Sequence, residues 1–261
     1  MTTDRDQWLA QVKEDILEPD LPICDPHHHL WDHPGRRYLI DELIEDTGSG
    51  HNVTSTVFVE CMSMYRADGP GAMRPVGETE FVGGVAAMSR SGRYGPTRVA
   101  AGIVSFADLT LGEGVGPVLD AHIAASPRFR GIRHAAGWDA SDQVRNSHTN
   151  PPPGLYGDDR FRRGFAELAR RGLAFDAWLY HPQIPELTGL ARAFPDTTII
   201  LDHFGGPRLC LSVGGRVLKP VPVADALSPE CEGHKWHSIS LQWRLPTNCL
   251  SLSCCSPGRS L

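Results

Sequence analysis

Short apolar segments alternate with helical segments along most of this 261-residue chain, and this alternation limits the folds open to it. The apolar segments are rich in β-branched residues, as in strands buried on both faces. Strands are expected at a first segment that ends near His29 and over Val53–Val59, Val99–Phe106, Phe129–His134, Leu173–Tyr180 and Thr197–Leu201. Helices are expected between them, over Tyr38–Ile44, Glu78–Met88, Val115–Ala125, Phe161–Arg171 and Ile184–Phe194. This rhythm predicts an α/β fold with a parallel sheet.

Polar residues stand at the carboxyl ends of the predicted strands. They are His27, His29, Glu60, Asp108, Arg133, His181 and His203. In a barrel of parallel strands the active site is built at that end of the sheet. A doubly wound sheet of the Rossmann type is the alternative, but no glycine-rich phosphate loop follows the first strand. The pattern favours a barrel with about six βα units before Pro207.

The segment Cys24–Asp32 holds three consecutive histidines at the end of the first predicted strand. Alternate side chains of a strand share one face, so His27 and His29 should point together and His28 away from them. Two neutral imidazoles placed in this way can bind one divalent ion. A solvated turn or a purification tag is the alternative, but this triplet is internal and has apolar neighbours on both sides. The segment therefore favours a metal site.

The run Asp-x-His-x-His followed by Leu-Trp-Asp, within Cys24–Asp32, resembles the amidohydrolase-related (amidohydrolase 2) branch of the metal-dependent hydrolases. Members of this family include lactonases and decarboxylases. The resemblance extends from about Ile23 to Pro207. It implies a fold of the (β/α)8 TIM-barrel type, here incomplete, with about six recognisable βα units and an aberrant C-terminal tail.

The resemblance also implies roles for individual residues. His181, within the run Phe175–Gln183, matches a third metal ligand beside His27 and His29. His203, within Leu201–Pro207, matches the histidine that activates water or polarises the substrate. The implied cofactor is one divalent metal, with zinc favoured, although metal dependence varies among related lactonases.

Arg133 is the other predicted catalytic residue, because a guanidinium suits a substrate carboxylate or a developing oxyanion. A surface salt bridge is an equal alternative for it. His134 should face away from Arg133, so only one of the two can point inward. His134 and Glu60 are weaker candidates for substrate binding, and Asp202 is expected on the opposite strand face from His203, in a structural role.

Three further polar residues are weaker candidates. For Asp108 the alternative is a helix cap, a role that carboxylates at strand ends often have. His148 and Asn150, on the proline-rich excursion Ala135–Gly157, could touch substrate or belong to a solvated loop.

The resemblance implies a metal-assisted hydrolase, and the expected reaction is the opening of a lactone, or a related carbonyl ester, of a small organic acid or sugar acid. A decarboxylase on the same scaffold and an inactive fragment are the alternatives. A net charge of −6 gives no basic face, so nucleic acid is not expected as a partner. No apolar run approaches the ~18 residues that span a bilayer, and the first 20 residues lack a signal-peptide core, which predicts a cytoplasmic protein acting on a small molecule. An oligomer is compatible with the sequence.

The chain divides into three predicted regions: an N-terminal helical addition over 1–20 (helix Thr3–Leu17), the partial barrel over 21–207, and an atypical tail over 208–261. Five of the seven cysteines fall in the tail, where no helical period is sustained and no strand-terminal aspartate follows Asp225. We therefore expect a frameshifted tail and an impaired enzyme, with a divergent extension as the alternative. Cys231, His234, His237 and Cys249 have only loosely zinc-like spacing.

Overall fold

The structure is a computed structural model. It describes residues 14–206 except Gln143, together with Gln7, Gln11 and the backbone of two short strands, β9 (Ser212–Val213) and β10 (Arg216–Val217). The predictions for the tail 208–261 otherwise lie outside the described residues. The predicted helix Thr3–Leu17 also lies mostly outside them, but its last residues, 14–17, are not helical.

Six parallel strands form the main sheet. They are β1 (Ile23–His28), β4 (Val53–Val59), β5 (Arg98–Ser105), β6 (Phe129–Arg133), β7 (Ala174–Ala177) and β8 (Ile199–Leu201). Their order in the sheet is their order along the chain, so every strand lies beside its predecessor. A doubly wound sheet reverses its strand order at a switch point, whereas a barrel does not. The predicted barrel type, with six βα units, is therefore confirmed.

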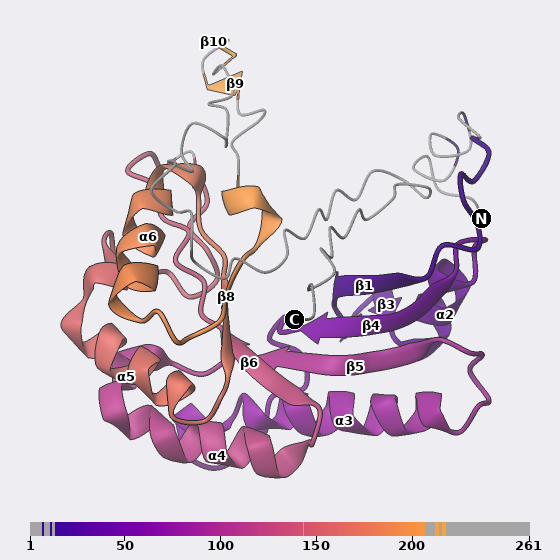
Figure 1. Cartoon of the computed structure of the whole chain (residues 1–261), viewed down its shortest axis with the longest axis horizontal. Helices are drawn as coiled ribbons and strands as arrows, with labels where there is room; N and C mark the ends of the chain where they lie inside the picture. Colours follow the sequence, from indigo (N-terminus) through magenta and orange to yellow (C-terminus); the bar gives the residue numbers. More distant parts are fainter. Residues whose placement is uncertain are drawn as a thin grey trace, which may run out of the picture.

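Helices line the convex side of this curved sheet (Figure 1). The main ones are α3 (Val76–Arg90), α4 (Gly116–Ala125), α5 (Asp159–Ala169) and α6 (Ile184–Ala193). Short 3-10 turns supplement them: η1 (Gly71–Met73), η2 (Leu109–Val115), η3 (Leu155–Gly157), η4 (His181–Gln183) and η5 (His203–Gly205). The main helices lie within a few residues of the predicted ones. No helix in the described part of the chain is long and apolar enough to cross a membrane.

The segment after β1 differs from its prediction. Residues Trp31–His33 (β2) and Arg36–Tyr38 (β3) form a small antiparallel hairpin, in which Tyr38 pairs with Trp31. The helix α2 therefore runs over Ile40–Thr47 instead of starting at Tyr38. Its start is fixed by Glu42, whose carboxylate accepts a hydrogen bond from the Leu39 amide at 2.9 Å.

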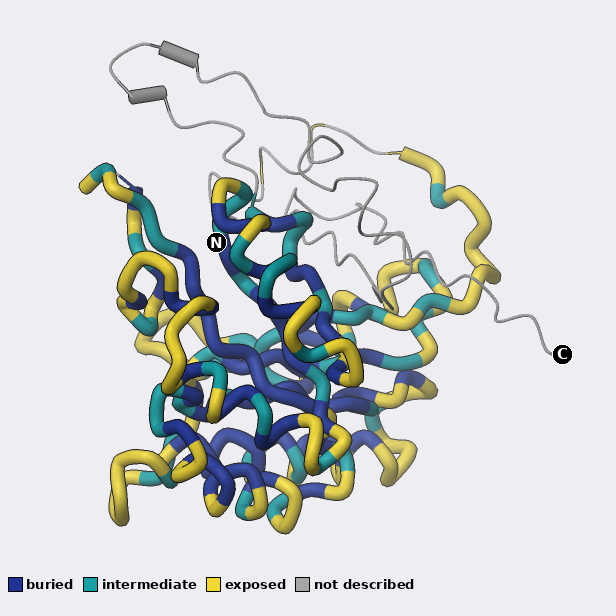
Figure 2. The backbone as a smooth tube through the Cα atoms, turned by 60° about the vertical axis from the view of Figure 1, so that its left-hand side comes forward, coloured by how far each residue is buried: buried dark blue, intermediate teal, exposed yellow. Residues whose placement is uncertain are grey.

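The apolar core lies between the sheet and the helices, and the strands are buried along most of their length (Figure 2). In β7, Phe175 and Ala177 belong to this core, so Asp176 between them faces the concave side. In β6, Ile132 belongs to the core and Arg133 faces the concave side, opposite Asp176 in the sheet register. The concave side thus carries buried charged groups, although the convex side is apolar.

Close packing of α5 on η2 generates a stability prediction. A methyl group added at Gly164 would lie 2.1 Å from the Leu109 carbonyl oxygen, so Gly164→Ala should lower the free energy of unfolding by about 2 kcal/mol or more. At Gly84, inside α3, a methyl group meets nothing within 4 Å. Gly84→Ala should therefore stabilise the protein by about 0.5–1 kcal/mol. Urea denaturation of both variants measures the two shifts, and equal shifts would contradict the described packing.

Candidate active site

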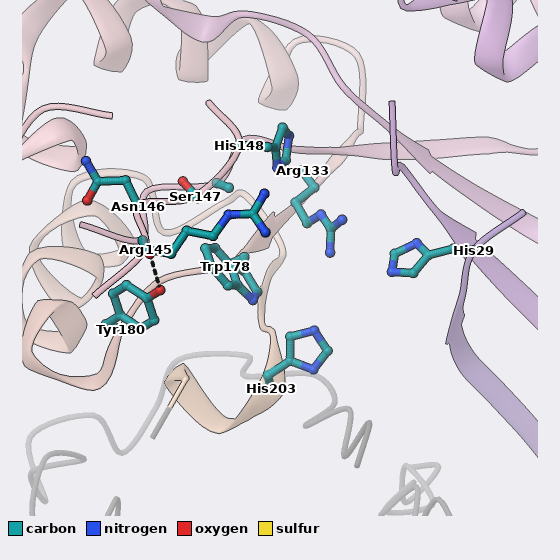
Figure 3. Close-up of a pocket in the computed structure, with 10 residues that line it drawn as sticks. His29, Arg133, Arg145, Asn146, Ser147, His148, Trp178, Tyr180 and His203 are labelled. Atoms are coloured by element: carbon teal, nitrogen blue, oxygen red, sulfur yellow. Dashed lines mark hydrogen bonds between the residues drawn. The ribbon is translucent and has the colours of Figure 1, made fainter. Parts of the chain in front are cut away.

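A pocket of about 380 Å³ opens at the carboxyl ends of the strands. His29 comes from the end of β1, Arg133 from β6, Trp178 from the residue after β7, and His203 from the residues after β8. The loop between β6 and α5 closes another side of the pocket. It contributes Ala135, Arg145, Asn146, Ser147 and His148, and Tyr180 completes the lining. Figure 3 shows His29, Arg133, His148 and His203 around a common space.

His27 and His29 point toward each other, and their Nε2 atoms lie 3.3 Å apart. His28 points away and pairs with the Thr56 hydroxyl, at 2.9 Å from its own Nε2. This placement agrees with the predicted alternation along the strand. Two nitrogen ligands on one tetrahedral zinc, each about 2.0–2.1 Å from the ion, are themselves about 3.3–3.4 Å apart. The spacing of this pair therefore fits a shared metal ion.

The outer nitrogens of both rings are held by acceptors. His29 Nδ1 lies 2.7 Å from the Val59 carbonyl oxygen, and His27 Nδ1 lies 3.1 Å from Asp202 Oδ1. A carbonyl oxygen can only accept, so the hydrogen of neutral His29 sits on Nδ1 and its Nε2 offers a lone pair. The carboxylate favours the same tautomer of His27. Metal-binding histidines are commonly oriented by such partners.

Arg133 is the buried centre of the charge network. Its Nε donates to Glu60 Oε1 at 2.8 Å, its Nη2 to the Glu60 carbonyl oxygen at 2.5 Å, and its Nη1 to Asp202 Oδ2 at 3.2 Å. Nη1 is also 3.4 Å from His27 Nε2. Burial alone would lower the pKa of the guanidinium, but the charges of Glu60 and Asp202 outweigh it and raise the pKa. The carboxylates of Glu60 and Asp202 together with the Arg133 guanidinium carry a net charge of about −1. This net negative charge is compatible with a cation near His27.

Asp202 corrects the sequence prediction, which placed it on the opposite face from His203. Its carboxylate is fully buried and contacts His27, Arg133 and, at 3.4 Å, His203 Nε2. Burial would raise the pKa of Asp202, but the neighbouring His27 imidazole holds it below the ordinary value. The alternation rule fails here because the chain leaves the strand: His203 and Phe204 have left-handed φ angles of 49° and 53°.

Asp176 is a further buried carboxyl group that the sequence interpretation left without a role. Burial, with the nearby Asp202 charge, raises the pKa of Asp176 well above its ordinary value, and the two carboxyl groups share a hydrogen bond. The signal that could have identified it is an acid in the middle of an apolar strand, Ala174–Ala177.

His203 lies at the pocket wall with its ring centroid 4.8 Å from that of His27. Burial lowers the pKa of His203 to about 4, although Asp202 opposes the shift, so the imidazole is neutral at pH 7. Among the described residues, His27, Asp202 and His203 form a group whose ligand atoms lie within 4.8 Å of one another. Asp202 and His203 are therefore available beside the His27–His29 pair.

The remaining predicted residues are more dispersed. His181 begins η4 and belongs neither to this group nor to the pocket lining, so its role as third ligand stays a prediction that this geometry does not support. His134 points away from the pocket, accepts a hydrogen bond from the Leu109 amide and packs between Phe106 and Phe161. A substrate contact by His134 finds no support in this placement.

Glu60 is fully buried behind Arg133, with His148 Nε2 3.5 Å from its Oε1. Asp108 caps η2 by accepting from the Thr110 amide, as the alternative interpretation of that carboxylate expected. Of the two loop residues, His148 lines the pocket and Asn150 does not. Glu60 thus supports Arg133 and does not line the pocket itself.

The buried ion pairs predict that removing the charge of Arg133 destabilises the protein. Arg133→Met leaves two buried carboxylates without their cation, so the free energy of unfolding at pH 7 should fall by about 3–5 kcal/mol. Adding Glu60→Gln removes one of these charges and should recover part of the loss. The control is Arg37→Met, which breaks an exposed pair with Glu42 and should change stability little. Similar losses in both single variants, measured by urea denaturation, would contradict the network.

Comparison with known proteins identifies the family of this chain. Residues 24–229 match the family model described as amidohydrolase, so the match continues beyond Pro207. The uncharacterized protein y4mH of Sinorhizobium fredii (strain NBRC 101917 / NGR234) is 33% identical over 208 residues, which make up 71% of this chain and 63% of that protein. The chain therefore spans less than two thirds of the length of this relative.

One solved structure shows the same fold, and a second is similar over a shorter part of the chain. Amidohydrolase 2 from Bifidobacterium longum subsp. infantis has a TM-score of 0.50 at 18% identity, over 87% of this chain and 76% of that one. An amidohydrolase from Burkholderia multivorans with bound zinc has a TM-score of 0.49 at 23% identity, over 71% of this chain and 59% of that one. The family match covers most of the sequence, and the sheet and the strand-end histidines agree with it. The chain belongs to the amidohydrolase family.

Proposed function

We propose that this protein is a metal-assisted hydrolase that opens a lactone of a small organic acid or sugar acid. The observation that carries the proposal is the His27–His29 pair, whose Nε2 atoms lie 3.3 Å apart beside a pocket at the strand ends. A divalent ion at this pair, with zinc favoured, would polarise a carbonyl and make water more acidic. Family membership supports the hydrolase class, and the pocket supports a small substrate.

His203 is the proposed proton carrier. Its neutral imidazole can accept a proton from water as the water oxygen bonds to the lactone carbonyl carbon. The imidazolium formed in this way would be stabilised by Asp202, 3.4 Å from Nε2. As the ring C–O bond breaks, the same proton passes to the departing alkoxide oxygen. Water is thereby added across the ester bond, and His203 returns to its neutral form.

Arg133 and Asp202 are proposed to position His27. Asp202 accepts from His27 Nδ1, and Arg133 holds the second oxygen of the same carboxylate. The three donor contacts of Arg133 to Glu60 and Asp202 favour this role over direct capture of a substrate carboxylate. Arg133 therefore orients His27 through Asp202 and balances the charges of Glu60 and Asp202. This role differs from its predicted role as a substrate ligand.

Metal binding is the first test. The double variant His27→Ala with His29→Ala should lose stoichiometric zinc and remain folded, because Asp202 keeps its ion pair with Arg133 when the two imidazoles are removed. Elemental analysis of the purified protein measures the metal, and circular dichroism checks the fold. His33→Ala, on the exposed β2–β3 hairpin, is the matched control and should retain the ion. Full zinc in the double variant would refute the assignment.

Turnover is the second test. On a panel of lactones, His203→Asn should lower kcat by about a hundredfold or more, as is common when a general acid–base group is lost. The Michaelis constant should change much less, since the lost interaction acts in the transition state. His33→Ala again serves as the control. If the zinc-loaded protein opens no lactone, or releases carbon dioxide from a carboxylic substrate, lactone hydrolysis is the wrong reaction.

A further inference from the structure

We infer that the pocket contains a separate anion-binding subsite at Arg145, which selects lactones that carry a free carboxylate. The inference rests on the proposed function in one respect, namely that the carboxylate-bearing ligand is a lactone. The subsite itself rests on the charges and contacts of the pocket.

The positive charge of Arg133 is already balanced by carboxylates of the protein. Its guanidinium donates to Glu60 and Asp202, and both carboxylates are fully buried beside it. A substrate carboxylate at Arg133 would have to displace one of them and leave it buried without a cation, at considerable cost. An anionic substrate group therefore needs another cation.

Arg145 supplies that cation. Its side chain extends into the pocket, toward the space between Arg133 and Trp178 (Figure 3). Within the described part of the chain its guanidinium forms no ion pair, and the residues that line the pocket include no aspartate or glutamate. Burial lowers the pKa of His148, which is therefore neutral at pH 7 and adds no charge. Apart from the ion proposed at the histidine pair, the described residues of the pocket thus present one uncompensated positive charge, which matches one carboxylate.

The backbone around Arg145 is held in place before any ligand binds. The Tyr180 hydroxyl donates to the Arg145 carbonyl oxygen at 2.5 Å, and the Ser147 amide donates to the Gly137 carbonyl oxygen at 2.9 Å. The Thr149 hydroxyl donates to the Ala135 carbonyl oxygen at 2.7 Å. A loop anchored at Arg145 and at the residues that follow it loses less conformational entropy when it binds a ligand.

The wall next to Arg145 limits the shape of the ligand. The Trp178 indole lies against Gly137, where an added methyl group would be 2.4 Å from the ring. This contact fixes one edge of the indole, which stands between Arg145 and His203 in the pocket (Figure 3). A small ring that lies along Trp178 can direct its carboxylate to Arg145 and its carbonyl toward His203. A guanidinium can bind such a carboxylate through two parallel hydrogen bonds.

Equilibrium binding tests the subsite without any turnover. The probes are tetrahydrofuran-2-carboxylate, a ring that cannot be hydrolysed, and its neutral carboxamide. Calorimetry on the full chain should show that the carboxylate binds about tenfold or more tightly than the carboxamide, as expected for a charge-assisted hydrogen bond. Arg145→Gln should abolish this preference, and Arg145→Lys should retain part of it. Arg93→Gln, at an exposed arginine outside the pocket, should leave the preference unchanged.

The outcomes separate the two proposals. If wild-type protein binds both probes equally, or if Arg145→Gln keeps the preference while its circular dichroism is native, the subsite does not exist. If Arg145→Gln is misfolded, the Arg145→Lys variant decides. A preference for the carboxylate over the carboxamide equal to that of the wild type would overturn the inference, and a reduced preference supports it. Selective carboxylate binding in a protein that opens no lactone would leave the anion subsite standing and reject only the hydrolase.

Discussion

The ion pairs of Arg133 hold the candidate site together. The guanidinium extends from the end of β6 and reaches Glu60 after β4 on one side and Asp202 after β8 on the other. Each of these three groups would be costly to bury alone, because a charge removed from water needs a compensating partner. Together they stabilise one another and fix the relative positions of three strand ends.

The orientation of the histidine pair follows from this network. Asp202 has one oxygen on Arg133 and the other on His27, so the direction of the His27 ring depends on a charge at β6. His29 is oriented independently, by the backbone carbonyl of Val59. One ring of the pair is thus positioned by a side-chain network and the other by the sheet itself. Changes in the network should disturb His27 more than His29.

The sequence predicted those features that depend on the regular geometry of strands and helices. Alternation along a strand was sufficient to pair His27 with His29, to turn His28 away, and to set Arg133 and His134 in opposite directions. It failed for Asp202, because the chain turns into a left-handed conformation at His203 and the alternation of a strand ends there. It also failed at Tyr38, where pairing with Trp31 in a hairpin overrides the helical spacing. The significance of Asp176 and Arg145 depends on neighbouring residues that are distant in the sequence. The periodicity of the sequence cannot reveal such neighbours.

The strand order of the sheet has a consequence for how the site is assembled. Since each strand lies beside its predecessor, the sheet can grow in the order in which a ribosome delivers the chain, one βα unit at a time. Glu60 emerges first, and its cation Arg133 follows with β6. Asp202 arrives last, with β8, and meets a guanidinium that is already in position. The acid that orients His27 is therefore added last, to a site in which Glu60 and Arg133 already balance each other.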